Sequence, residues 1–161
     1  MNYPSKTFTV EEAKKKLEHY CAYRDRSHKE VKNKLNELRM IPEAQDLIIL
    51  HLIQEGFLNE ERFAKSFVRG KFNYKKWGKR KIVQALKRQD IQPRLIEKAL
   101  EEIKEEDYQT TIEKLIRQKR KDYKEKNSYK LKQKIFQYLL QKGYAYEDFA
   151  DVYSLLEKET K

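Results

Sequence analysis

Apolar residues recur at spacings of three to five along nearly the whole chain, which is the spacing of one buried face on successive helices. Alternation of apolar and polar residues, which would indicate strands, is not sustained anywhere. The apolar stripes comprise four groups: Ala13, Leu17 and Tyr20; Val31, Leu35 and Leu38; Ile48, Leu52 and Ile53; Phe63, Phe67 and Phe72. The pattern therefore predicts an all-α protein with these side chains in its core.

Proline, glycine and asparagine mark where the helices begin and end. Asn59 stands before two glutamates, which is typical of a helix N-cap followed by acidic residues in the first turn. Gly56 suits the position that follows a helix C-terminus, whereas Pro42 and Pro93 suit the first position inside a helix. Only four glycines and three prolines are present, so we expect short connections.

The apolar pattern repeats with a period of about 50 residues. Shifting residues 27–56 by 51 positions superposes Pro42 on Pro93 and matches apolar residues throughout, and a further shift of 53 continues the series. Three tandem units of three helices are therefore predicted, with these boundaries: 9–56, 57–106 and 107–158, preceded by a flexible segment 1–8 and followed by a tail 159–161. Because a unit this small buries little apolar surface, neighbouring units should pack together in an elongated array that can curve.

The charge balance favours an anionic partner. Lys and Arg number 37 against 26 Asp and Glu, which gives a formal net charge of +11. Nucleic acid, a nucleoprotein and an anionic membrane surface are all compatible with this excess. Hydrophobic and charged residues each make up 39% of the chain, so we expect a thin core.

Cysteine content and hydropathy bear on the compartment. The single cysteine, Cys21, excludes an internal disulfide and is expected to be a small buried side chain. The N-terminal residues contain no apolar run of signal-peptide length, and no run of about 18 apolar residues occurs elsewhere. We therefore expect a cytoplasmic protein without a membrane partner, and we take it to be a monomer.

Sequence signatures of catalysis are absent. The four glycines are too scattered for a phosphate-binding loop or a dinucleotide fingerprint. The three histidines lie far apart, without the spacing of a zinc site. Acidic clusters such as 105–107 are expected to be solvated first-turn residues of helices rather than catalytic carboxylates. The sequence thus predicts a non-enzymatic protein that needs no cofactor or metal.

The segment 65–88 carries ten Lys or Arg residues and no Asp or Glu. This one-sided composition predicts a binding surface rather than a face that only aids solubility. Tyr74 and Trp77 lie between two predicted helices, where each ring could close the bundle or contact the partner. The candidate contact residues in this part of the chain are Arg69, Lys71, Lys75, Lys76, Trp77, Lys79, Arg80, Lys81 and Arg88. A second basic tract, 114–134, contains Asp122 and Glu125 and is equally compatible with contact or with an ordinary charged helix pair.

Several segments resemble the RecX family of regulatory proteins. RDRSHKEVKNKL (24–35) is similar to the R-x-R-S-x-x-E-x-x-x-K-L stretch of that family. GFLNEERFAKSFV (56–68) and WGKRKIVQAL (77–86) resemble its G-[FLY]-[LI]-[DN]-[DE]-x-R-[FY]-A and G-x-x-[RK]-I-x-x-x-L segments, and QKGYAYEDF (141–149) resembles its closing R-G-[FY] segment. The resemblance extends over about residues 10–155. Asn59 replaces a frequent Asp and Lys142 a frequent Arg, which changes what these positions can bind.

The resemblance implies a modulator of the RecA recombinase, built of tandem three-helix units. Such a protein lies on the RecA filament on single-stranded DNA and restrains its ATPase, strand exchange and coprotease activities. Arg24 and Arg26 of the first unit are then expected to join the contact, with Trp77 as an anchor. Arg62 is expected instead to tie two helices together.

Two other functions remain open at this stage. A protein that binds single strands or duplex without a protein partner would use the same cations, and its affinity would fall steeply with salt. A peripheral membrane helix is less favoured, because no segment combines a wide apolar face with basic flanks.

Overall fold

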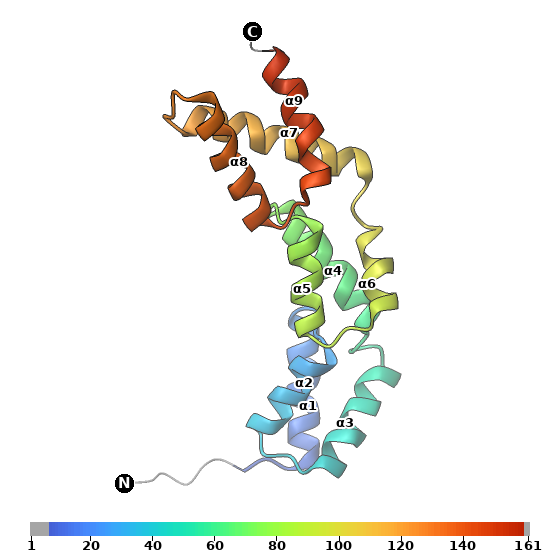
Figure 1. Cartoon of the computed structure of the whole chain (residues 1–161). Helices are drawn as coiled ribbons and strands as arrows, with labels where there is room; N and C mark the ends of the chain where they lie inside the picture. The colour runs from blue at the N-terminus through green and yellow to red at the C-terminus, as the bar shows by residue number, and fades with distance from the viewer. Residues whose placement is uncertain (1–6, 160–161) are drawn as a thin grey trace, which may run out of the picture.

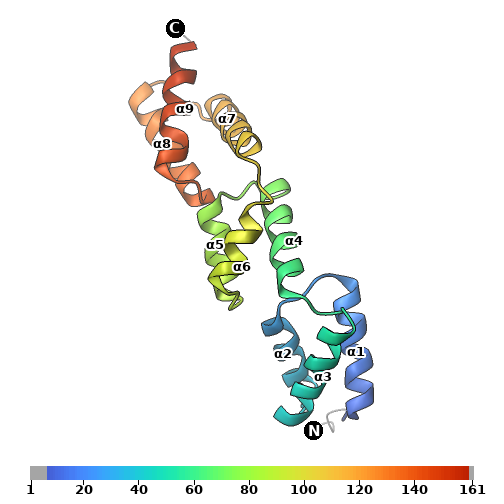
Figure 2. The same ribbon diagram turned by 90° about the vertical axis from the view of Figure 1, so that its right-hand side faces the viewer.

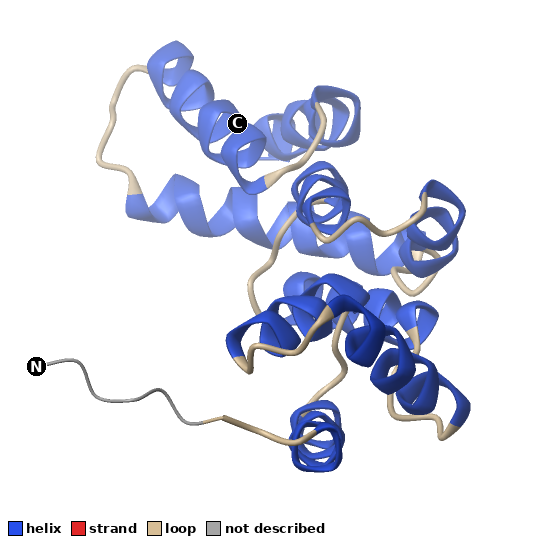
Figure 3. Cartoon of the chain, turned by 90° about the horizontal axis from the view of Figure 1, so that it is seen from below, coloured by secondary structure: helices blue, strands red, loops and turns tan. Residues whose placement is uncertain are grey.

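The computed structural model describes residues 7–159, and all regular structure in this range is helical (Figures 1 and 3). The helices are α1 (Val10–Tyr23), α2 (His28–Glu37), α3 (Pro42–Gln54), α4 (Glu60–Asn73), α5 (Lys79–Arg88), α6 (Pro93–Leu100), α7 (Glu105–Asp122), α8 (Ser128–Lys142) and α9 (Tyr146–Glu159). The prediction of an all-α helical array is confirmed. Most of the segment 1–8 and of the tail 159–161 lies outside the described residues.

Local sequence signals explain most of the helix ends. The Asn59 side chain accepts a hydrogen bond from the Arg62 N–H at 2.9 Å, which confirms the predicted cap of α4. Pro42 and Pro93 stand in the first turns of α3 and α6, also as predicted. Gly56 follows α3 with a φ of +77°, a conformation that glycine adopts without strain. The first turn of α7 begins at Glu105, so the predicted boundary at 106/107 falls inside this helix.

The repeat positions found in the sequence form the core. Val31, Ile82 and Ile135 are each fully buried, and they lie on the middle helices α2, α5 and α8 of successive units. The same holds one helical turn later for Leu35, Leu86 and Leu139. Burial of a side chain of this size contributes about 1.5–3 kcal/mol, so these positions are a principal source of stability in every unit. Cys21 is also buried, as expected, whereas the expectation for Ile53 was wrong because 43% of it is exposed.

The core is divided into two clusters. The first lies within α1–α3 and includes Leu17, Leu35 and Leu52. The second extends without interruption through α4–α9, where Phe72 and Tyr108 bring their ring centroids to 5.9 Å across the second and third units. The second and third units therefore share one core, while the first unit has a core of its own.

The joint between the first and second units is polar. Arg62 of α4 donates to the Asp25 carboxylate at 2.6 Å, and Ser27 donates to Gln89 at 2.7 Å. The Lys29 ammonium donates to the carbonyl oxygen of Arg88 at 2.8 Å. Hydrogen bonds rather than shared apolar side chains thus make up this joint.

The units follow one another along an elongated molecule (Figures 1 and 2). The middle helices α2, α5 and α8 succeed each other along one side, while α7 runs across the long axis and makes the array bend at its C-terminal end (Figure 1). No helix within residues 7–159 has the length and apolar content needed to cross a membrane.

Candidate interaction surface

The second and third units meet at two glycines. Gly78 caps the N-terminus of α5, and Gly143 caps the C-terminus of α8 with a φ of +102°. The Gly78 N–H donates to the Lys142 carbonyl at 2.7 Å, and the Arg80 N–H donates to the Gly143 carbonyl at 3.0 Å. Because the free N–H groups of one helix end are paired with the free carbonyls of the other, α8 is stacked head to tail on α5 (Figure 1).

This stack brings together two helices that lack acidic residues. Neither α5 nor α8 contains an Asp or Glu. Beside the glycine contact lies an open groove, which we call the basic groove, lined by Arg80, Lys81, Gln84, Arg88, Leu140, Gln141 and Gly143. Within the described part of the chain, Arg80 and Arg88 form no ion pair. With Gln84 they are spaced four residues apart on α5, so that three planar polar groups follow one face of the helix.

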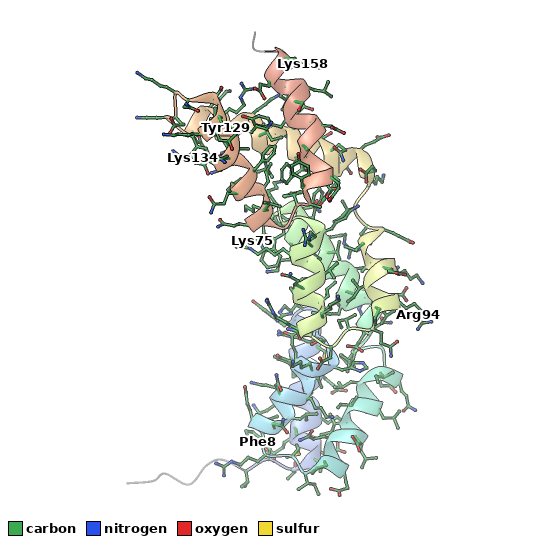
Figure 4. All side chains as sticks on the ribbon, in the orientation of Figure 1. Phe8, Lys75, Arg94, Tyr129, Lys134 and Lys158 are labelled. Carbon is green, nitrogen blue, oxygen red and sulfur yellow. The ribbon has the colours of Figure 1, made fainter. Side chains whose placement is uncertain are left out.

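The loop before α5 carries further cations to the same region. The side chains of Lys75 and Lys76 are exposed, while their carbonyl oxygens accept hydrogen bonds from the third unit. The Lys142 ammonium donates to Lys75 and the Tyr144 hydroxyl to Lys76, each at 2.8 Å. The loop backbone is therefore held in place and its side chains point outward. Figure 4 shows Lys75 and Lys134 on one side of the molecule and Arg94 on the opposite side.

Crowding of cations is evident at Lys142. Partial burial lowers the pKa of its ammonium, and the nearby charges of Lys81, Lys119 and Lys75 lower it further. An anion in this region would relieve the mutual repulsion of these groups. The electrostatics therefore favour a negatively charged partner at the joint.

Trp77 is an integral part of the fold as well as part of this surface. Its half-buried ring packs against the shared core, and the ammonium groups of Lys71 and Lys81 lie 4.7 and 4.6 Å from the ring centroid. These cation–π contacts favour the observed positions of the two ammonium groups. Tyr74, in contrast, is 86% exposed. Of the two rings left open by the sequence, Trp77 closes the bundle and Tyr74 faces solvent.

Some predicted contact residues are paired with acids that are distant in the sequence. Arg69 forms an ion pair with Glu102, and Lys79 lies 3.7 Å from Glu105 and above the ring of Tyr108. The segment 65–88 lacks acids in its own sequence, but the turn after α6 brings Glu102 to it and the start of α7 brings Glu105. Arg69 and Lys79 thus have acidic partners, unlike Arg80 and Arg88, which form no ion pair within residues 7–159.

The two candidates in the first unit are also engaged internally. Arg26 is only 8% exposed, and its guanidinium stacks 3.6 Å from the centroid of the Tyr20 ring while Nε donates to the Tyr20 carbonyl. Arg26 is thus held inside the first unit, and its part in the filament contact stays a prediction. Arg24 is exposed, but it donates to Glu30 at 2.5 Å and lies in a different unit from the basic groove.

Sequence reasoning missed the contribution of the C-terminal end of α8. Leu140, Gln141 and Gly143 line the basic groove, although the tract singled out in the sequence was 114–134. The better signal is the absence of acids from residues 126–146, which include five lysines. Within residues 7–159 there is no group of His, Cys, Asp or Glu side chains suited to hold a metal ion.

Comparisons with known proteins give a consistent result. A family model described as "RecX, second three-helix domain" matches residues 59–100, and one described as "RecX, third three-helix domain" matches residues 105–152. Regulatory protein RecX of Finegoldia magna is 33% identical over 80% of this chain and 63% of its own length. The corresponding protein of Haemophilus influenzae is 29% identical over 81% of this chain and 86% of its own length.

Solved structures show the same architecture. The crystal structure of RecX from Lactobacillus salivarius matches with a TM-score of 0.83 and 25% identity, covering 92% of this chain and 96% of that one. The relative from Oceanobacillus iheyensis is 32% identical, but the match spans only 46% of its length. This chain thus spans between about half and just under two thirds of the length of these two curated relatives.

Proposed function

Because this chain belongs to the RecX family, we propose that it is a non-enzymatic modulator of the RecA recombinase that binds RecA filaments on single-stranded DNA. In this role it restrains the ATPase, strand-exchange and coprotease activities of the filament. It would act as a monomer in the cytoplasm and regulate DNA recombination and repair, including the SOS response.

The observation that carries this proposal is that Arg80 and Arg88 form no ion pair within residues 7–159 and lie on an α5–α8 stack without acids. Guanidinium groups bind carboxylates and phosphates with two parallel hydrogen bonds, and both kinds of anion occur on a nucleoprotein filament. We assign the filament contact to the basic groove together with Lys75 and Lys76. Direct contact with DNA phosphates is part of this proposal.

The overall shape supports the same assignment. A filament presents the same surface on every protomer, and an elongated array of similar units can contact neighbouring protomers at once (Figure 2). Each further contact between linked units is intramolecular, so that several weak contacts give a high overall affinity.

The test is binding to fluorescently labelled single-stranded DNA, bare or coated with RecA and a slowly hydrolysed ATP analogue, followed by anisotropy. The groove variant, Arg80→Glu with Arg88→Glu, is compared with a control variant, Lys15→Glu with Arg94→Glu. Both variants change the net charge by the same amount, and none of these four side chains forms an ion pair within residues 7–159.

We expect the wild type and the control to prefer coated DNA at both about 50 and about 200 mM salt, and the groove variant to bind about tenfold more weakly or worse. Binding to bare DNA that equals or exceeds binding to coated DNA would contradict the proposal. If that binding also fell about a hundredfold between the two salt concentrations, release of about five counterions from a single strand would explain it. The alternative, a sequence-nonspecific DNA-binding helical protein without a RecA partner, would then be favoured.

A further inference from the structure

The outward face of α3 is apolar. Leu47 is 65% exposed, Leu50 is 51% exposed and Ile53 is 43% exposed, and Ile41 just before the helix is also exposed. No other helix among the described residues exposes three large aliphatic side chains to this extent. Apolar residues scattered singly over a surface are normal, whereas apolar residues that adjoin on one face often mark an interaction site.

The repeat itself provides an internal comparison. The residues at the places of Leu47, Leu50 and Ile53 in the second unit are Lys98, Glu101 and Lys104, and those in the third unit are Asp151, Ser154 and Glu157. Of these, Lys98 lies on α6, which ends at Leu100, and all three residues of the third unit lie on α9. The third helix of the unit is therefore built with polar residues at these places in both of the other units. Folding does not require them to be apolar, so the exposed side chains of the first unit need another explanation.

The charge around this face is opposite to that of the whole protein. Residues 40–61 contain five Asp or Glu and no Lys or Arg, although the chain has a net charge of +11. Glu43, Asp46 and Glu55 are exposed on α3 or directly after it, and they border the apolar side chains along the helix. The face thus combines an apolar centre with an acidic rim, whereas the basic groove has neither.

We propose that the outer face of α3 is a docking surface for a basic amphipathic helix of a partner protein. Leu47 and Leu50 are three residues apart and lie on one side of α3, so they can pack against apolar residues spaced three and four apart on the incoming helix. Lysine or arginine residues that flank its apolar stripe would pair with Glu43, Asp46 and Glu55. The site is independent of the basic groove, and it adds a second partner-binding surface to the molecule.

A second copy of this chain fits the face less well. A helix of 13 residues is only about 20 Å long, so pairing two copies of α3 buries less surface than the 1,200 Å² or so that stable interfaces need. Such pairing would also bring two acidic rims together. A partner helix with basic flanks avoids this repulsion and gains from the charges.

The probe is a fluorescently labelled synthetic helix with a leucine stripe and lysine flanks, together with a matched peptide in which glutamate replaces every lysine. Binding is measured to the full chain and to a repeat-guided variant, Leu47→Lys, Leu50→Glu and Ile53→Lys, which installs the residues of the second unit. Leu155→Lys serves as the control, since Leu155 is 63% exposed on α9. Sedimentation equilibrium of the wild type reports self-association.

We expect the wild type and the control to bind the lysine peptide with a Kd of about 10 µM, and the repeat-guided variant to bind about tenfold more weakly or worse. The glutamate peptide should bind as weakly as that variant does. A rim variant, Glu43→Lys with Asp46→Lys, leaves the apolar residues in place and should reverse the preference between the two peptides. Equal binding of both peptides to the wild type, or unchanged binding by either variant, would overturn the proposal. A wild-type dimer that the repeat-guided variant abolishes would assign the face to a second copy.

Discussion

Gly78 and Gly143 touch backbone to backbone where the second and third units meet. A Cβ atom on Gly78 would overlap the carbonyl group of Gly143, and a Cβ atom on Gly143 would overlap the Lys81 backbone and side chain. Glycine at both positions is what permits α8 to stack on α5. The geometry of the basic groove depends on this contact, because residues of both helices line it.

Gly78→Ala is therefore expected to destabilise the protein by about 1–3 kcal/mol, since the methyl group would force the two backbones apart. Gly70 is the matched control: it lies inside α4, and a Cβ there would meet nothing within 4 Å. Gly70→Ala should stabilise by about 0.5–1 kcal/mol, because alanine loses less backbone freedom in a helix. Urea unfolding of both variants measures these changes in the free energy of unfolding. Equal effects of the two substitutions would contradict the close contact of Gly78 with Gly143.

Arg62 is expected to act on stability and not on partner binding. Its Nε donates to Asp25 at 2.6 Å, and its Nη2 donates to the carbonyl oxygens of Gly56 and Phe57. A lysine ammonium cannot make these three hydrogen bonds with the geometry of a guanidinium, so Arg62→Lys should lower the free energy of unfolding by about 1–2 kcal/mol. A larger loss is not expected, because the Arg62 side chain is partly exposed to solvent. Filament affinity of the folded variant should stay within about twofold of the wild type. Loss of binding with unchanged stability would make Arg62 a contact residue instead.

The single cysteine and the single tryptophan report on different cores. Cys21 is buried in the first unit, where burial raises the pKa of its thiol to about 11, and Trp77 packs on the core shared by the second and third units. The native thiol should resist a thiol reagent at about pH 8. Because the two cores are separate clusters and hydrogen bonds such as those of Arg62 and Ser27 join the units, we expect thiol labelling and tryptophan fluorescence to change at different urea concentrations. Coincident transitions would show instead that all three units unfold together.

High pH is expected to weaken the joint between the second and third units. Burial is the main cause that raises the pKa of both Tyr108 and Tyr144, whose ring centroids lie 5.2 Å apart. The fold therefore favours the neutral phenols, and stability that is complete below about pH 10 falls as the pH rises, because the unfolded chain loses these protons first.

Above about pH 10, the free energy of unfolding should fall by about 1.4 kcal/mol per pH unit for each of the two tyrosines. Tyr144→Phe should cost about 1 kcal/mol near neutral pH, through loss of the hydrogen bond to the Lys76 carbonyl, and should then reduce the alkaline slope by one tyrosine. Urea midpoints at several pH values measure both effects. If stability fell equally steeply with pH in the wild type and in the variant, Tyr144 would not be a cause of the alkaline destabilisation.

The fold was largely predictable because its core repeats. Val31, Ile82 and Ile135 occupy one position of the unit, and a period of about 50 residues is visible in apolar residues alone. Ile53 was placed wrongly because α3 carries large apolar residues on its outer face as well as its inner one, so the spacing does not distinguish the two faces.

The surface was less predictable than the core. A run without acids indicates a basic segment, but it does not exclude acids that the fold brings close, as Glu102 does for Arg69 and Glu105 for Lys79. Arg26 looks like a surface cation in sequence, and only the structure reveals the Tyr20 ring that covers it. Sequence spacing predicts which side chains are neighbours on one helix, whereas these pairs join residues of different parts of the fold.

The most direct test of the central claim is the rate of ATP hydrolysis by RecA on single-stranded DNA, in the presence of the wild type, the groove variant or the control variant. We predict that the wild type and the Lys15→Glu, Arg94→Glu control lower this rate, and that the Arg80→Glu, Arg88→Glu variant requires about tenfold more protein for the same effect. Inhibition by the groove variant at the same concentration as the wild type would contradict the assignment of the basic groove. Absence of any inhibition by the wild type would contradict the proposed function itself.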